Sequence, residues 1–373
     1  MIYLDNAATT LHKPYTVSEA AQKAIRRMTT PGRGGHSASM LAAETAYRCR
    51  ERAASLFGVN SPESIVLTFN ATHALNIAIK SLAREGSRVL ISGYEHNSVV
   101  RPLNTIGARV IVAVSELFEP EDAVRAFERR LGGAELVVIN HTSNVFGYIL
   151  PVERIAEMCK AARVPLIIDA SQSAGVVDID FERLGADFIA MPGHKGLYGP
   201  QGTGILIARG GKTLIEGGTG GNSQLPEMPD FLPDRLEAGT HNMPGIAGLE
   251  QGLKFVEKVG TKKILAHEKA LVRQAADGLG QIAGIRLYKA NNEENQTGVL
   301  SFNLRDLPSE QVAGALSERN IAVRAGLHCA PLAHRSVGTL SQGTVRMSVS
   351  VFNTKFEINR MLNHIEDISK KIK

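Results

Sequence analysis

Long apolar runs are missing from this 373-residue sequence. No stretch approaches the roughly 20 apolar residues that a membrane-spanning helix needs, so we expect no membrane segment. The first residues, MIYLDNAATT, lack a basic region followed by an apolar stretch, and we therefore expect no export signal and a cytoplasmic protein. An apolar content of 43% with 21% charged residues is typical of a soluble globular protein, and the length suggests two domains.

Cysteine is scarce, and charge of one sign is nowhere concentrated. Three cysteines form an odd set that argues against a disulfide framework and suits a reducing compartment. Cys49 and Cys159 lie in helical patterns, where we expect them to pack, whereas Cys329 lies in a turn with Gly and His neighbours. The net charge of +5 is dispersed, as in residues 125–130, so we do not expect nucleic-acid binding, although anionic small molecules could be attracted.

Short apolar runs bounded by turn residues alternate with helical patterns between residues 64 and 209. This alternation predicts an α/β domain with a mainly parallel sheet covered on both faces. Ligands should then collect where the strands end in loops. The expected strands are residues 88–92, 135–139, 165–168, 188–190 and 204–207.

The remainder of the chain predicts a long ordered loop over residues 210–242 and a smaller α+β domain beginning near residue 257. We assign residues 15–256 to a large domain, and residues 1–14 with 257–373 to a small one. The elements expected beyond the loop are helices within 246–279, 308–318 and 355–371 and strands at 285–288, 299–302 and 345–349.

A lysine stands directly after one of these expected strands. Residues 192–200 read PGHKGLYGP, and Lys195 follows the apolar run 187–191. Another expected strand ends in Asp169. A loop lysine is most often solvated and an Asp at a strand end is often a helix cap, so neither is specific alone. Together they match pyridoxal phosphate (PLP), which needs a lysine for a Schiff base and a carboxylate for its pyridine nitrogen.

An anion site for the PLP phosphate is also expected. Residues 69–76 leave a strand-like run and open a helix, so backbone N–H groups, the helix dipole and the Thr72 hydroxyl could converge on a phosphate. A plain helix cap is the alternative for this segment. His96 follows the next strand, where a neutral imidazole could stack on the cofactor ring, unless it is an ordinary surface histidine.

The order of these segments resembles the class V aminotransferase group of fold-type I PLP enzymes. Within it the chain is similar to cysteine desulfurases of the short-loop type, the SUF-type and selenocysteine lyase-like enzymes. The resemblance runs from residues 3–10 to 352–354. It implies an α/β fold with a mainly parallel seven-stranded sheet in the large domain, a small α+β C-terminal domain, and a homodimer with shared active sites.

The resemblance also implies a role for individual residues. Lys195 would form the Schiff base, Asp169 would hold the pyridine nitrogen, and His96 would stack on the ring and take part in catalysis. The other expected cofactor residues are Gln172 at the phenolic oxygen, Thr72, His73 and His194 at the phosphate side, and Thr240 from the neighbouring subunit. The expected substrate residues are Asn144 and Arg346 at the carboxylate and Arg324 and His328 beside Cys329. No metal ligands are assigned.

Cys329 lies in VRAGLHCAP, which resembles the short-loop desulfurase turn. A lone cysteine is more often buried and inert, and a free thiol is only a few per cent ionised at neutral pH, so a nucleophilic role would need help from Arg324, His328 and an exposed turn. The implied reaction converts L-cysteine to L-alanine and leaves a persulfide on Cys329 for a sulfur-acceptor protein or thiol.

Other functions stay open at this point. They are a selenocysteine lyase acting on L-selenocysteine, another class V lyase, aminotransferase or epimerase in which Cys329 is incidental, and a non-enzymatic scaffold that docks a sulfur acceptor. Iron–sulfur cluster supply is one of several pathways that use desulfurase chemistry. Departures from the family pattern leave substrate and acceptor preference undecided; they are Pro192, His73, Leu327 and His241.

Overall fold

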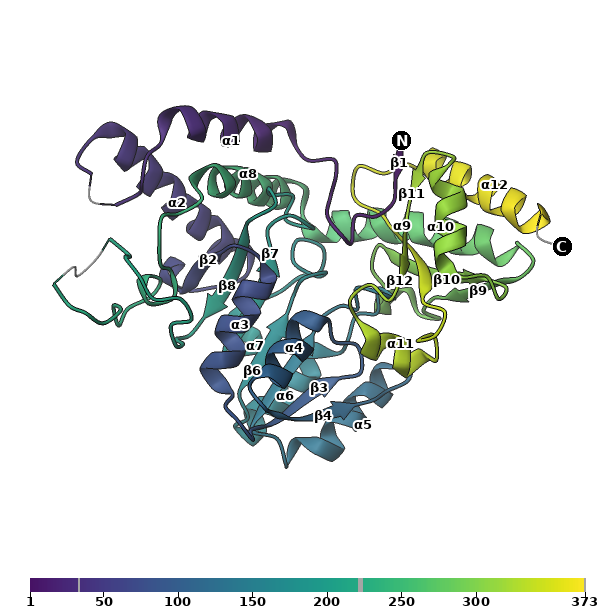
Figure 1. The fold of residues 1–373 in the computed structure, drawn as a ribbon, viewed down its shortest axis with the longest axis horizontal. Helices are drawn as coiled ribbons and strands as arrows, with labels where there is room; N and C mark the ends of the chain where they lie inside the picture. The colour runs from purple at the N-terminus through teal and green to yellow at the C-terminus, as the bar shows by residue number, and fades with distance from the viewer. Residues whose placement is uncertain (33, 221–223, 372–373) are drawn as a thin grey trace.

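A computed structural model describes residues 1–32, 34–220 and 224–371 of the chain. A seven-stranded sheet forms the centre of its larger part (Figure 1). In order across the sheet, the strands are β2 (Ile65–Thr68), β8 (Gly204–Ala208), β7 (Phe188–Pro192), β6 (Leu166–Asp169), β5 (Leu136–Asn140), β3 (Arg88–Ser92) and β4 (Arg109–Ala113). Only β8 runs antiparallel to its neighbours. The predicted α/β fold with a mainly parallel seven-stranded sheet is therefore confirmed.

Helices cover both faces of this sheet, because successive side chains of a strand point to opposite faces. In β5, Val138 packs with α3 (Ala71–Leu82) and α4 (Asn97–Thr105). Its neighbour Val137 belongs to the core on the other face. The helices in that second core are α2 (Ser37–Leu56), α5 (Pro120–Leu131), α6 (Val152–Ala162), α7 (Phe181–Leu184) and α8 (Met243–Val259).

A second, antiparallel sheet lies beside the first (Figure 1). Its core is separate from those of the large sheet. The four strands are, in order, β12 (Arg324–Gly326), β13 (Thr344–Ser348), β10 (Val299–Leu304) and β9 (Ile285–Tyr288). The helices that contribute to this core are α9 (Thr261–Gly280), α10 (Ser309–Ser317) and α12 (Lys355–Lys371). The short helix α11 (Pro331–Val337) instead packs through Ala333 with the core of the large sheet.

The N-terminal segment crosses from one part of the molecule to the other. β1 (Ile2–Tyr3) pairs in parallel with β11 (Ile321–Ala322). The Asn6 side chain then donates to the Ser348 carbonyl at 2.9 Å, and the chain continues to α1 (Tyr15–Arg27), which packs on α8. The N-terminal residues thus contact both parts of the fold.

The expected elements are found, with differences at the edges. β4 was not predicted; it lies at the sheet edge, where only Ala113 is buried. Three-residue 3-10 turns complete the element set at η1 (Pro62–Ser64), η2 (Asp234–Leu236) and η3 (Glu293–Asn295). In the expected loop 210–242, η2 is the only helical element among the described residues, and 221–223 lie outside them.

The division into two domains stays a prediction. α8 runs to Val259, three residues past the predicted boundary at 256, and Gly260 separates it from α9 with a φ of 86°. Among the helices that the structure describes, none combines the length and apolar character that crossing a bilayer requires.

Candidate active site

Polar side chains gather in a pocket with about 530 Å³ of empty space at the carboxyl ends of the parallel strands. Asn140, Asp169 and Pro192 end β5, β6 and β7, and the following loops supply most of the other walls. Ligands of open α/β sheets bind at this edge, so the pocket lies where the strand pattern predicts a site. It brings together these predicted residues: Thr72, His96, Asn144, Asp169, Gln172, His194 and Lys195.

Lys195 stands in the loop after β7. Burial lowers the pKa of Lys195 to about 8, and the positive charge of Arg346 lowers it as well. A lysine with this pKa has a sizeable neutral fraction near neutral pH, and the neutral amine is the nucleophile that forms a Schiff base.

The N-terminal segment holds the loop that carries Lys195. The Thr10 N–H donates to the His194 carbonyl at 3.1 Å, and the Thr9 hydroxyl lies 3.0 Å from Nδ1 of His194. Burial lowers the pKa of His194 to about 4, so its imidazole is neutral near pH 7. Gln172 is fixed by the same segment, because its Nε2 donates to the Ala7 carbonyl at 2.9 Å.

Asp169 and His96 form two further walls of the pocket. Asp169 is buried, and its Oδ1 accepts a hydrogen bond from the Ser171 N–H at 2.9 Å. Burial lowers the pKa of His96, and its Nδ1 accepts from the Ser98 N–H at 3.0 Å. The proton of the neutral imidazole therefore lies on Nε2. A buried carboxylate and a neutral imidazole are thus present in one pocket.

The N-terminus of α3 opens into the pocket and suits an anion. The Asn70 side chain caps the helix by accepting from the His73 N–H at 2.9 Å. No hydrogen bond among the described residues uses the N–H groups of Ala71 or Thr72. The Thr72 and Ser98 hydroxyls lie 2.9 Å apart beside them. Unused N–H groups, a helix dipole and two hydroxyls together provide a site for a phosphate.

Arg346 is buried and does not itself line the pocket, but it bonds to Asn144, which does. Its Nη2 donates to Oδ1 of Asp5 at 2.7 Å and its Nη1 to the Asn144 carbonyl at 2.9 Å, while its Nε has no partner among the described residues. The Asn144 side chain donates to the His328 carbonyl at 2.7 Å. Arg324, on β12, is exposed and lies opposite Arg346 in the ladder with β13. Substrate binding by these residues stays a prediction.

Cys329 lies on an exposed turn that is tied to the pocket wall. Its carbonyl accepts from the Asn97 N–H, next to His96, at 2.8 Å. Both His328 and Cys329 have positive φ angles, 49° and 58°. Non-glycine residues in this region cost on the order of 1–3 kcal/mol each and persist only where the surroundings hold them. The turn therefore keeps the backbone of Cys329 at a defined place beside the segment that bears His96.

The help that His328 was expected to give to ionisation of Cys329 cannot come from a positive charge on its ring, and any other help stays a prediction. Burial and the nearby Arg346 charge lower the pKa of His328 to about 2, so the imidazole is neutral near pH 7. Its Nε2 lies 3.1 Å from the Thr344 carbonyl, which accepts the ring proton. His328 therefore supports the turn as a hydrogen-bonded core residue.

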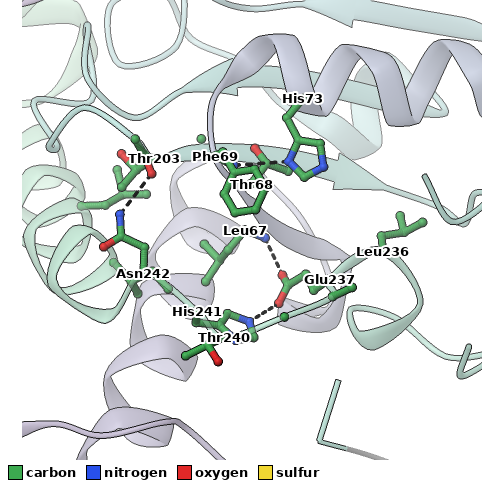
Figure 2. A pocket seen from close by; sticks show the side chains of 16 residues that line it. Leu67, Thr68, Phe69, His73, Thr203, Leu236, Glu237, Thr240, His241 and Asn242 are labelled. Atoms are coloured by element: carbon green, nitrogen blue, oxygen red, sulfur yellow. Dashed lines mark hydrogen bonds and ion pairs between the residues drawn. The ribbon is translucent and has the colours of Figure 1, made fainter. Parts of the chain in front are cut away.

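The structure does not bring His73 or Thr240 into this pocket. Both line a second pocket, shown in Figure 2, where the His73 ring stacks on Phe69 at 4.7 Å. Successive helix residues point about 100° apart, so Thr72 and His73 face different sides of α3. The cofactor role of His73 is thus not supported within one chain. Thr240 was expected to act from the neighbouring subunit, and this stays a prediction.

Glu237 is the centre of the second pocket. Its carboxylate accepts a hydrogen bond from the Leu67 N–H at 2.5 Å and lies 2.6 Å from His241 Nε2 (Figure 2). It also accepts two hydrogen bonds of 2.7 Å from the Arg50 guanidinium. His241, one of the departures from the family pattern, is therefore bound to a buried ion pair.

Several residues of the site were not predicted from the sequence. Asp5 pairs with Arg346, Ser98 adjoins the anion site, and Asn140 lines the pocket. Glu95 lies behind the pocket wall and is fully buried. Ser98 and Glu95 stand within two residues of His96 in the sequence. Both are polar residues that follow a buried strand, and this pattern could have identified them.

The pocket combines a lysine with a lowered pKa, a buried carboxylate, a neutral imidazole and an anion site, which are the groups that PLP requires. The residues fit the cofactor, and fold and site together define a PLP-dependent enzyme of fold type I. The family model "Aminotransferase class-V" matches residues 2–361, and the chain belongs to that family. Enzymes of this family use PLP, so the cofactor prediction is confirmed.

Named relatives agree with this assignment. The chain is 32% identical to a "Probable cysteine desulfurase" of Pyrococcus abyssi, with 100% of this chain and 95% of the relative covered. A second relative of the same name, from Halalkalibacterium halodurans, is 32% identical with 98% and 92% covered. The solved apo structure of a cysteine desulfurase from Thermococcus onnurineus NA1 is similar at a TM-score of 0.90 and 30% identity, with 100% and 95% covered.

Proposed function

We propose that this protein is a PLP-dependent cysteine desulfurase that converts L-cysteine to L-alanine and takes the sulfur onto Cys329. The observation that carries the proposal is the place of Cys329, an exposed thiol on a turn bonded to the segment that bears His96. The relatives named as cysteine desulfurases support the same reaction. A turn held in an unfavourable conformation beside a cofactor pocket serves positioning better than packing.

The pocket residues divide the work. PLP, when bound, withdraws electrons from the α-carbon of the amino acid. Asp169 would hold the pyridine nitrogen of the cofactor, and the first turn of α3 with Thr72 would bind its phosphate. Lys195, with its pKa of about 8, removes the α-proton of the substrate and returns a proton to the product. Arg346 binds the substrate carboxylate at the pocket edge.

Cys329 performs the sulfur chemistry. Its thiolate attacks the substrate sulfur, so that an S–S bond forms while the Cβ–S bond of the substrate breaks. The electron pair of the broken bond stays on carbon and is protonated, which yields alanine and a persulfide on Cys329. An acceptor thiol then takes the outer sulfur and restores the Cys329 thiol, so atoms and electrons balance over the cycle.

The test measures alanine release from L-cysteine by the holoenzyme, with and without dithiothreitol. We expect Cys329→Ala to lose at least about 100-fold of the activity while its bound-PLP absorbance stays unchanged. Cys159→Ala is the matched control, because Cys159 is buried in α6 and should retain full activity. Equal alanine release by the parent and Cys329→Ala would refute the role of Cys329. Alanine release from L-selenocysteine, assayed in parallel, but not from L-cysteine would point to a selenocysteine lyase.

The second part of the proposal is the assembly of two chains into a dimer. We propose a homodimer in which Thr240 of the partner subunit reaches the phosphate site, since Thr240 does not line that site within its own chain. Phe69, half-exposed at the second pocket, supports an interface there. Sedimentation velocity tests the dimer. Mixed dimers of Lys195→Ala and Thr240→Ala test the shared site, and recovery of activity on mixing is the expected result.

The sulfur acceptor and the location complete the proposal. A protein or small-molecule thiol takes the persulfide sulfur from Cys329, which lies on the surface. An exposed thiol stays reduced in the cytoplasm, where we place the protein. Transfer of ³⁵S from labelled cysteine to proteins of a cell extract tests the acceptor, and fractionation of the native host cells tests the location.

A further inference from the structure

Glu95 is a fully buried acid directly behind the wall of the cofactor pocket. It lies between the end of β3 and the start of α4, one residue before His96. It does not line the pocket, and none of the roles described above uses it. A buried carboxyl without an ion-pair partner is costly, so its presence at this place calls for a function.

The carboxyl of Glu95 joins two strand ends. Its Oε1 accepts hydrogen bonds from the Ser92 hydroxyl at 2.6 Å and from the Asn140 N–H at 2.9 Å. The Asn140 side chain in turn donates to the Tyr94 carbonyl at 2.8 Å. The turn that leads to His96 is thereby fastened to the end of β5.

This connection reaches three walls of the pocket. His96 directly follows Glu95 in the chain, and the Asn140 N–H donates to the Glu95 carboxyl. Asp169 lies opposite Asn140 in the ladder between β5 and β6. All three side chains line the cofactor pocket. A change in the Glu95 carboxyl would therefore shift the residues that meet the cofactor ring.

The charge state of Glu95 follows from its surroundings. The groups that act on it are the Ser92 hydroxyl and backbone of β3, the Asn140 N–H of β5 and, through its charge, Asp169 at the end of β6. Burial raises the pKa of Glu95 to about 8, the negative charge of Asp169 raises it as well, and the two hydrogen bonds oppose the rise. Near pH 7 Glu95 is neutral. Its Oε2, which has no partner among the described residues, then carries the proton.

We propose that Glu95 is a positioning residue that acts as a neutral acid and fastens the end of β5 to the turn before His96. A neutral Glu95 adds no charge behind the wall formed by His96, Asn140 and Asp169. The inference rests on the proposed function only in that PLP occupies the pocket.

Infrared spectroscopy of the holoenzyme tests the charge state without relying on activity. A protonated carboxylic acid has a carbonyl band that a carboxylate lacks. We expect such a band at pH 7 that disappears in Glu95→Gln. Glu268 is a second buried acid with a raised pKa, so Glu268→Gln, which removes only the other acid, is the matched control. A Glu95→Gln holoenzyme that loses no acid band at pH 7 would overturn the proposal.

Binding of PLP to the stripped protein tests the positioning role. An amide offers the same acceptor and donor as a neutral acid, so Glu95→Gln should bind PLP within about threefold of the parent. Glu95→Leu leaves the Ser92 and Asn140 donors unsatisfied and should bind at least about tenfold more weakly, with an altered absorption spectrum of bound PLP. If Glu95→Leu fails to fold, Glu95→Gln still decides the question, because weakening of tenfold or more in Glu95→Gln contradicts a neutral acid.

These measurements separate the two proposals. Neither the infrared nor the PLP-binding measurement uses L-cysteine. If the protein makes no alanine but gives both expected results for Glu95, the proposal for Glu95 stands and the desulfurase proposal fails. A Glu95→Leu protein that binds PLP as tightly as the parent, with an unchanged spectrum, would show that Glu95 positions nothing.

Discussion

Replacement of Glu268 by glutamine should make the protein more stable, and the gain should grow with pH. Glu268 lies on α9 and is almost fully buried. Burial raises its pKa from 4.5 to about 8, although a hydrogen bond from the Gly298 backbone opposes the rise. Between these pH values the unfolded chain loses the Glu268 proton while the folded protein keeps it. The free energy of unfolding therefore falls as pH rises.

The size of the effect follows from the pKa change. Each pH unit between the two pKa values costs about 1.4 kcal/mol, which sums to about 5 kcal/mol over the whole interval. Glutamine does not titrate, so the variant escapes this loss. The difference in unfolding free energy between Glu268→Gln and the parent should thus be smallest near pH 5 and increase by several kcal/mol by pH 8.

Urea unfolding at pH 5, 6, 7 and 8 measures this difference. Circular dichroism is the suitable probe, because the sequence has no tryptophan. Glu19→Gln is the control, since Glu19 is exposed on α1 and its replacement should leave the pH dependence unchanged. A constant difference between Glu268→Gln and the parent at all four pH values would refute the reasoning.

Three further outcomes are expected. Arg50→Ala should lower the free energy of unfolding by about 3–5 kcal/mol, because it removes the guanidinium that pairs with the buried Glu237 carboxylate and leaves it only the Leu67 N–H and His241. Arg154→Ala, at an exposed pair, should cost under about 1 kcal/mol, and equal losses in urea unfolding would contradict the argument. Arg346→Lys should raise the KM for L-cysteine about tenfold or more, which steady-state kinetics checks, and an unchanged KM would exclude carboxylate binding there. In PLP-free protein, the rate of Schiff-base formation at Lys195 should rise with pH and level off above about 8, whereas a rise that continues past pH 10 would indicate an ordinary lysine.

Residues at strand ends were the most predictable part of the site. Lys195 and Asp169 directly follow or end buried strands, and parallel strands bring their carboxyl ends to one edge of a sheet. The pocket lies at this edge of the sheet, as the strand pattern predicts. Thr72 was likewise identified from a strand followed by a helix start.

Other parts depend on geometry that local patterns do not carry. The Asp5–Arg346 pair joins residues 341 positions apart and exists only because the N-terminal segment crosses to β13. His73 was placed with Thr72 although one step along a helix turns a side chain to another side. The neutral state of His328 depends on burial by residues distant in the sequence, which motif reasoning does not describe.

The N-terminal segment has a consequence for synthesis of the protein. Asn6 bonds to Ser348 and Asn353, and the Thr10 N–H bonds to the loop that carries Lys195. A ribosome releases Asn6 among the first residues and its partners among the last. The large sheet can form while translation continues, but the wall that fixes Gln172 and His194 has to wait for the distal strand β13. Capacity to hold the cofactor in its final geometry is therefore acquired only near the end of translation.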